Sequence, residues 1–137
     1  MKTALVTGAS RGIGRAAALK LASDGYAVAI NYNNNTAAAE EVCRLINEKG
    51  GNAAVFQADV ADKAAVNKML EDIKQKLGTV DVLVNNAGVA RQIMFCDIDE
   101  KEWDRIFDID VKGVYNVTQA VIEGMVHKKS GRIINIS

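Results

Sequence analysis

Thr7-Gly8-Ala9-Ser10-Arg11-Gly12-Ile13-Gly14 follows a short apolar run at 2–7 and precedes a longer segment of helical period. At such a junction, the N–H groups and positive dipole of the helix N-terminus can face a pyrophosphate. One glycine permits the tight turn, another lets the backbone approach the phosphates, and a third lets the helix pack against the sheet. The stretch therefore predicts a dinucleotide-binding turn. The alternative is a tight turn that binds no nucleotide.

The rest of the chain alternates short apolar runs with longer helical segments, which is typical of βαβ units around a parallel sheet. Gly25, Gly50-Gly51 and Gly78 are expected to end helices. The pattern predicts a Rossmann-like, doubly wound α/β sandwich with about five parallel strands. Strands are expected at 2–7, 27–31, 53–58, 80–84 and 132–136, and helices from about 12 to 24, from the polar turn at 33–36 to about 49, from 62 to 77 and from 99 to 127.

The composition is that of one ordinary globular domain, 1–137, with 17 basic and 17 acidic side chains. Lys and Arg do not gather on one face, so no nucleic-acid partner is expected. No apolar segment is long enough to span a bilayer. Cys43 and Cys96 have no metal-ligand or redox spacing, so no metal site is expected. Reduced thiols and the absence of a signal peptide favour a cytoplasmic location.

Glycines spaced as Gly8-x-x-x-Gly12-x-Gly14 differ from the common G-x-G-x-x-G fingerprint. With Asp59 and the segment 85–88, Asn-Asn-Ala-Gly, they resemble the short-chain dehydrogenase/reductase family over the whole chain. Stretches 4–15 and 131–137 look closest to its β-ketoacyl-[acyl-carrier-protein] reductases. Stretches 102–107, 111–116 and 127–131 also look like the branch that reduces an aminopentanone modification on elongation factor P.

The expected cofactor is NADP(H). NAD-binding Rossmann sites usually carry an acidic residue after the second strand, where it repels a 2′-phosphate. This chain has asparagines and a tyrosine there, and Arg11 offers a cation for that phosphate. The alternatives are a solvated turn arginine and a loop of asparagines that tolerate left-handed conformations. The predicted cofactor residues up to this loop are Gly8, Ser10, Arg11, Gly12, Ile13, Gly14, Asn31, Tyr32 and Asn33.

The resemblance adds residues from two further strand ends to the cofactor site. It places Asp59 near the adenine with Val60 beside it, although Asp59 could equally be a neighbour of a helix cap. It places Asn86, Ala87 and Gly88 along the path of the cofactor over the strand ends.

The resemblance also implies the chemistry. Hydride passes from the nicotinamide to a carbonyl while a Tyr donates a proton, a Lys lowers the pKa of that Tyr, and a Ser orients the substrate oxygen. A helix Asn completes the relay, and its position corresponds to Asp110. An Asp lacks the amide donor and adds charge, so an ordinary proton relay is in doubt. The alternative is that Asp110 is only a polar residue of the helix.

The Ser and the Tyr-x-x-x-Lys pair are expected beyond Ser137, together with the C-terminal strands. Tyr26, Tyr32 and Tyr115 have no Lys four residues later and cannot substitute. The 137 residues alone are therefore expected to be inactive.

We expect the complete protein to be an NADPH-dependent ketoreductase acting on a 3-oxoacyl thioester or a similar small or carrier-bound ketone. The alternatives are the elongation factor P 5-aminopentanone reductase and a nucleotide-binding module without turnover. Trp103 and Phe107, four residues apart, are expected to pack against the sheet or a neighbouring subunit. The resemblance places the long helix in a subunit interface, which implies a homotetramer or homodimer. His127 is expected to complement the dipole at the end of this helix.

Overall fold

The structure, a computed structural model, describes residues 1–89 and 92–137. Within this part of the chain, five parallel strands form one sheet in the order β3-β2-β1-β4-β5. The expected α/β architecture is therefore confirmed. The strands are β1 (Thr3–Val6), β2 (Ala27–Tyr32), β3 (Asn52–Gln57), β4 (Val80–Asn85) and β5 (Arg132–Asn135).

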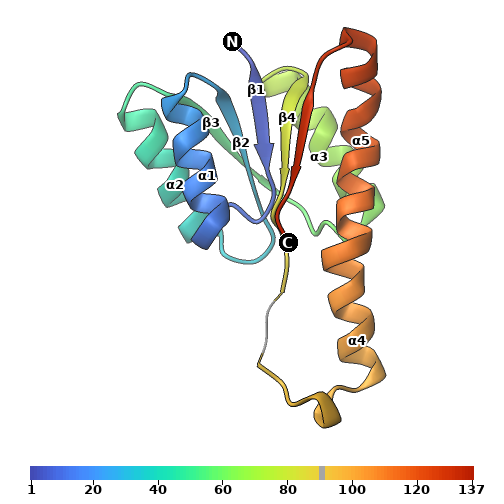
Figure 1. Cartoon of the computed structure of the whole chain (residues 1–137). Helices are drawn as coiled ribbons and strands as arrows, with labels where there is room; N and C mark the ends of the chain where they lie inside the picture. The colour runs from blue at the N-terminus through green and yellow to red at the C-terminus, as the bar shows by residue number, and fades with distance from the viewer. Residues whose placement is uncertain (90–91) are drawn as a thin grey trace.

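Helices cover both faces of this sheet (Figure 1). Helices α1 (Gly12–Ser23) and α2 (Thr36–Glu48) lie on one face, and α3 (Lys63–Lys76) and α5 (Gly113–Lys128) lie on the other. A short 3₁₀ turn, η1 (Phe95–Asp97), precedes α4 (Glu100–Phe107), which extends past the carboxyl ends of the strands.

The central strand β1 contributes to both cores. Ala4 and Val6 pack with α1 and α2, whereas Leu5 packs with α3 and α5, and all three side chains are fully buried. Successive strand residues point to opposite faces, so a strand covered on both sides reads as a continuous apolar run. This is why the strand at 2–7 was recognisable from sequence.

Three helices begin at a residue whose side chain accepts a backbone N–H of the first turn. These residues are Asn35 for α2, Asp62 for α3 and Asp99 for α4. By contrast, Arg11 at the start of α1 makes no capping hydrogen bond with its side chain. The first N–H groups of a helix have no partner within it, so those of α1 are left to another acceptor.

The single helix expected at 99–127 instead contains a π-helical turn, η2 (Asp108–Lys112), between α4 and α5. A π turn inserts extra backbone without breaking the helix. Apolar periodicity cannot reveal one such turn. Just after it, Gly113 packs against Val60, and a Cβ at Gly113 would lie 2.5 Å from Val60 Cγ2.

Asp81 ties three elements together at the amino end of the sheet. One carboxylate oxygen accepts the Thr3 N–H at 2.8 Å, and the other pairs with Lys128 at the end of α5. Burial opposes ionisation of Asp81, but the hydrogen bonds from Lys128 and Thr3 outweigh it. The pKa of Asp81 therefore lies below its ordinary value of 3.8.

Asp81→Asn is expected to lower the free energy of unfolding at pH 7 by about 1 kcal/mol, since Lys128 is partly solvent-screened. Because the folded-state pKa is depressed, this stabilisation is complete above the unfolded-state value and is lost as pH falls through the folded-state pKa. Urea titrations at pH 7 and pH 3 measure it. Asp72→Asn, which breaks an exposed pair with Lys68, is the control with the smaller effect. Equal effects of both variants at pH 7 would contradict the assignment.

Candidate functional site

The predicted site residues converge at the carboxyl ends of the strands. The chain order of the strands reverses at β1, which lies between β2 and β4. In open α/β sheets, ligands bind in the crevice at such a switch point. The glycine turn at 7–14 follows β1, and the loop at 86–89 follows β4, so both border this crevice (Figure 1).

Thr7 and Asn86 join these two loops. The buried Thr7 Oγ1 accepts the N–H groups of Asn86 and Ala87, each at 2.9 Å. In return, Asn86 Nδ2 donates to the carbonyls of Thr7 and Gly8 at 3.2 and 3.1 Å. Sequence reasoning did not assign Thr7 a role, although a hydroxyl between a buried strand and a glycine turn was a usable signal.

The three glycines of the turn have different surroundings. A Cβ at Gly8 would lie 2.9 Å from Ala87 Cα, and one at Gly14 would overlap Asn86 Nδ2 and the Gly8 carbonyl oxygen. A Cβ at Gly12 would meet no atom within 4 Å, although its φ of +57° favours glycine. Gly8 and Gly14 therefore permit close packing, whereas Gly12 leaves open the surface over the start of α1.

This open surface fits the phosphates of a dinucleotide. The uncapped start of α1 offers backbone N–H groups and positive dipole to an anion. Arg11 and Gly12 are exposed, Ser10 is half-buried, and Ile13 is 63% exposed despite being apolar. The turn thus has the donors, the space and the cation that a pyrophosphate and a neighbouring phosphate require.

At the end of β2, two of the predicted cofactor residues have buried side chains. Asn31 is 1% exposed and points beneath the glycine turn, where its Oδ1 accepts the Gly8 N–H at 3.2 Å. Tyr32 is buried in the core shared with α1 and α2. Only Asn33 of this predicted trio is exposed. Strand β2 extends through Tyr32, so the side chains of Asn31 and Tyr32 remain covered by helices.

At the end of β3, Val60 is also buried, packing with α3 and α5, so its side chain does not face the crevice. Its carbonyl accepts a hydrogen bond from Asn116 Nδ2 at 2.9 Å. Asp59 is half-buried, and its Oδ1 accepts the Ala61 N–H at 2.9 Å. Asp59 therefore shapes this loop, and sequence reasoning did not identify Asn116 as the support of Val60.

Asp110 lies beside the loop that follows β4. It is exposed within η2, and its Oδ1 accepts the Val89 N–H at 3.1 Å. A Cβ on exposed Gly88 would lie 3.1 Å from the same oxygen. The π turn thus brings a carboxylate to the predicted path of the cofactor. This is the place that the resemblance predicts for an amide.

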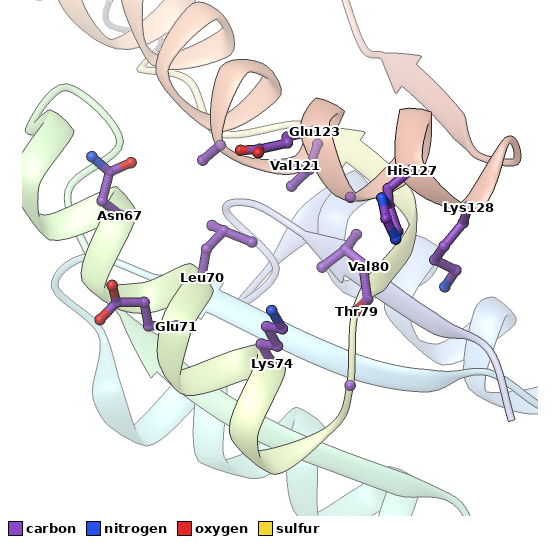
Figure 2. A pocket seen from close by; sticks show the side chains of 13 residues that line it. Asn67, Leu70, Glu71, Lys74, Thr79, Val80, Val121, Glu123, His127 and Lys128 are labelled. Carbon is purple, nitrogen blue, oxygen red and sulfur yellow. The ribbon is translucent and has the colours of Figure 1, made fainter.

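A groove of about 610 Å³ lies between α3 and α5, at the start of β4, where Leu70, Val80 and Val121 line it (Figure 2). Its lining includes Thr79 and Val80 at the amino end of β4, so it lies away from the glycine turn at the carboxyl ends of the strands. His127 lines this groove from the last turn of α5. Its position is the one expected for complementing the dipole of the helix, and it is remote from the candidate site.

Within residues 1–89 and 92–137, no helix has the length and apolarity needed to cross a bilayer. In the same residues, no cluster of three or more His, Cys, Asp or Glu side chains could hold a metal ion.

Residues 2–137 match the family described as short chain dehydrogenase. The chain is 46% identical over 136 residues to the 3-oxoacyl-[acyl-carrier-protein] reductase FabG of Staphylococcus aureus, covering 99% of this chain and 55% of that protein. It is 43% identical to the 3-oxoacyl-[acyl-carrier-protein] reductase of a Synechocystis species, with the same coverage. The chain thus spans about half the length of these relatives.

Among solved structures, the chain is similar to a gluconate 5-dehydrogenase from Burkholderia cenocepacia in complex with NADP and tartrate. The TM-score is 0.88 at 35% sequence identity, and the similarity covers 98% of this chain and 52% of that one.

Proposed function

This chain belongs to the short chain dehydrogenase family, and on that premise we propose that it forms the NADPH-holding domain of a carbonyl reductase. The observation that carries the proposal is the uncapped, open start of α1 beside exposed Arg11. The solved relative in complex with NADP supports the same cofactor. When bound, the cofactor supplies the hydride that reduces a carbonyl carbon.

The residues of this chain bind and orient the cofactor. The N–H groups at the start of α1 hold the pyrophosphate, and Arg11 pairs with the 2′-phosphate. Asn33 lies where an acidic residue would repel that phosphate. Ile13, Ala87 and Gly88 line the path toward the nicotinamide. Thr7 and Asn86 keep the two loops at a fixed separation, so little ordering is needed on binding.

Asp110 has a different task, because it reaches the nicotinamide end of this path and not the phosphates. Its carboxylate accepts hydrogen bonds but lacks the N–H donors of an amide. We propose that Asp110 holds a water molecule by accepting a hydrogen bond from it and donates none. Proton donation to the substrate then falls to another group, which the resemblance identifies as the Tyr of a Tyr-x-x-x-Lys pair.

The proposed substrate is a 3-oxoacyl thioester on a carrier protein, since the relatives from Staphylococcus and Synechocystis bear that activity in their names. The alternative is the aminopentanone group on elongation factor P, which stretches 102–107 and 111–116 favour. Turnover of the full-length protein with each substrate separates the two. A cytoplasmic homodimer or homotetramer is proposed as the working form. Trp103 and Phe107 are exposed, and their stacked rings have centroids 4.7 Å apart. Such a pair fits an interface along the long helix.

The full-length protein is expected to bind NADPH at least about tenfold more tightly than NADH, because a hydrogen bond between charged groups contributes about 1.5–3 kcal/mol and about 1.4 kcal/mol is tenfold in affinity. Arg11→Ala should weaken NADPH binding and leave NADH binding unchanged. Asn33→Asp should shift preference toward NADH. Calorimetric titration of both cofactors measures these changes.

Asn31→Asp does not test cofactor preference, because Asn31 is buried under the turn, whereas Asn33 is exposed. The matched control is Asn34→Asp, which adds the same charge at the next exposed position. Tighter binding of NADH than of NADPH by the wild-type protein would refute the proposal.

A further inference from the structure

Asn31 is a polar side chain at the carboxyl end of β2 with 1% exposure. Its Oδ1 accepts the Gly8 N–H at 3.2 Å. Its Nδ2 lies 3.3 Å from the Phe56 carbonyl, 3.1 Å from the Ala58 carbonyl and 3.3 Å from Met69 Sδ. One amide therefore joins the glycine turn after β1 to the end of β3.

Gly8 is held by two amides from opposite sides. Asn31 accepts its N–H from the β2 side, and Asn86 donates to its carbonyl from the β4 side at 3.1 Å. The backbone of Asn31 adds a contact, because its carbonyl accepts the Ala9 N–H at 2.9 Å. The start of the phosphate-binding turn is thus fixed between the two neighbouring strands.

The loop after β3 is likewise fixed on two sides. Asn31 binds the Ala58 carbonyl, and Asn116 on α5 binds the Val60 carbonyl at 2.9 Å. Between them lies Asp59, which the resemblance places near the adenine. The same amide that holds the phosphate turn therefore also holds the backbone beside this predicted adenine wall.

We propose that Asn31 is a positioning residue that couples the phosphate turn to the adenine-side loop, and so sets cofactor affinity without touching the cofactor. The inference rests on the proposed function, because it concerns the same NADPH site. If the two walls keep one separation, the adenosine and pyrophosphate parts of the cofactor bind without reordering either loop.

The site requires an amide, because the position needs an acceptor and donors at once. Aspartate keeps the acceptor for Gly8 but loses both donors and places a charge against two carbonyl oxygens. Leucine, which has the same branched shape but larger terminal groups, leaves the Gly8 N–H and the carbonyls of Phe56 and Ala58 without this partner. Both changes uncouple the two walls, and only the first adds charge.

The test compares Asn31→Leu and Asn31→Asp with wild type in the full-length protein. The matched control is Thr3→Val. Thr3 is equally buried and its hydroxyl donates to the Leu77 carbonyl at 2.6 Å, but it lies at the opposite end of the sheet. The measurements are the NADPH dissociation constant, the melting temperature, KM and kcat, and amide hydrogen exchange at Gly8.

Both Asn31 variants are expected to raise the dissociation constant and KM for NADPH at least tenfold. The kcat at saturating NADPH should change less than twofold. Exchange at Gly8 should become faster in Asn31→Leu, which removes the acceptor of the Gly8 N–H. Thr3→Val should lower the melting temperature without changing the dissociation constant. Asn31→Ser, which keeps a smaller polar group, replaces any variant that does not fold.

Unchanged NADPH affinity in a folded Asn31 variant would overturn the inference. A wild-type protein that does not bind NADPH would instead overturn the proposed function. The two failures are thus distinguishable. Exchange at Gly8 no faster in Asn31→Leu than in Thr3→Val would also count against the coupling, whether or not NADPH binds.

Discussion

Gly12→Val in the full-length protein is expected to weaken NADPH binding by at least about a hundredfold, or about 2.7 kcal/mol, while the protein remains folded. The added side chain meets no protein atom within 4 Å of its Cβ, so it enters the space left for the pyrophosphate. Backbone approach to the phosphates is then blocked. Calorimetric titration with NADPH, run beside a thermal melt, measures both effects.

Backbone strain also contributes to this variant, because Gly12 has a φ of +57°. A side chain in that region costs roughly 1–2 kcal/mol. Gly25→Val is the matched control, since Gly25 also has a positive φ and open space around it but follows the far end of α1. Similar melting temperatures with very different NADPH affinities would separate the phosphate effect from the strain.

Gly14→Ala is the opposite case. Its Cβ would overlap Asn86 Nδ2 and the Gly8 carbonyl oxygen, so this variant should lose folding stability together with binding. If Gly12→Val unfolds as readily as Gly14→Ala, the stretch is a tight turn and not a phosphate site.

The isolated 137-residue chain is expected to turn over a ketone substrate at least about 10²-fold more slowly than the full-length protein. None of its three tyrosines has a Lys four residues later. Loss of a positioned general acid typically costs about 10²–10⁴-fold. An NADPH-consumption assay with equal concentrations of both proteins measures the difference. Comparable rates would mean that Asp110 or another group in these residues donates the proton.

The same isolated chain is expected to self-associate through β5. This strand ends the sheet, and Ile134 on it is 47% exposed. An edge strand with unpaired backbone groups and apolar side chains favours pairing with another chain. Light scattering should show oligomers, and Ile134→Lys should reduce them. A monomeric wild-type chain at high concentration would contradict this expectation.

The sequence was sufficient to predict the architecture, because its signals are local. Buried parallel strands such as β1 are continuous apolar runs, and the caps Asp62 and Asp99 mark where helices begin. The π turn at Asp108–Lys112 left no such signal, since it changes the backbone of a helix without changing its apolar pattern.

The candidate site was predictable only in part. The glycine turn was identified because spacing and position in the chain both constrain it. The burial of the Asn31 side chain under the glycine turn was not predicted, because the direction of a side chain at a strand end depends on where the strand stops. The supports Thr7 and Asn116 were missed because their partners lie far away in the chain. Sequence proximity carries no information about such contacts.

The position of β1 in the sheet has a kinetic consequence. One edge of β1 pairs with β2, from which one helix separates it in the chain, whereas the other edge pairs with β4, from which three helices separate it. Closing the longer loop costs more chain entropy, and nonlocal pairing is slow. We therefore expect β1, β2 and β3 to assemble first, with Asn31 already bound to Gly8. The contacts between Thr7 and Asn86 then form in a later step, so that the two sides of the crevice are completed one after the other during folding.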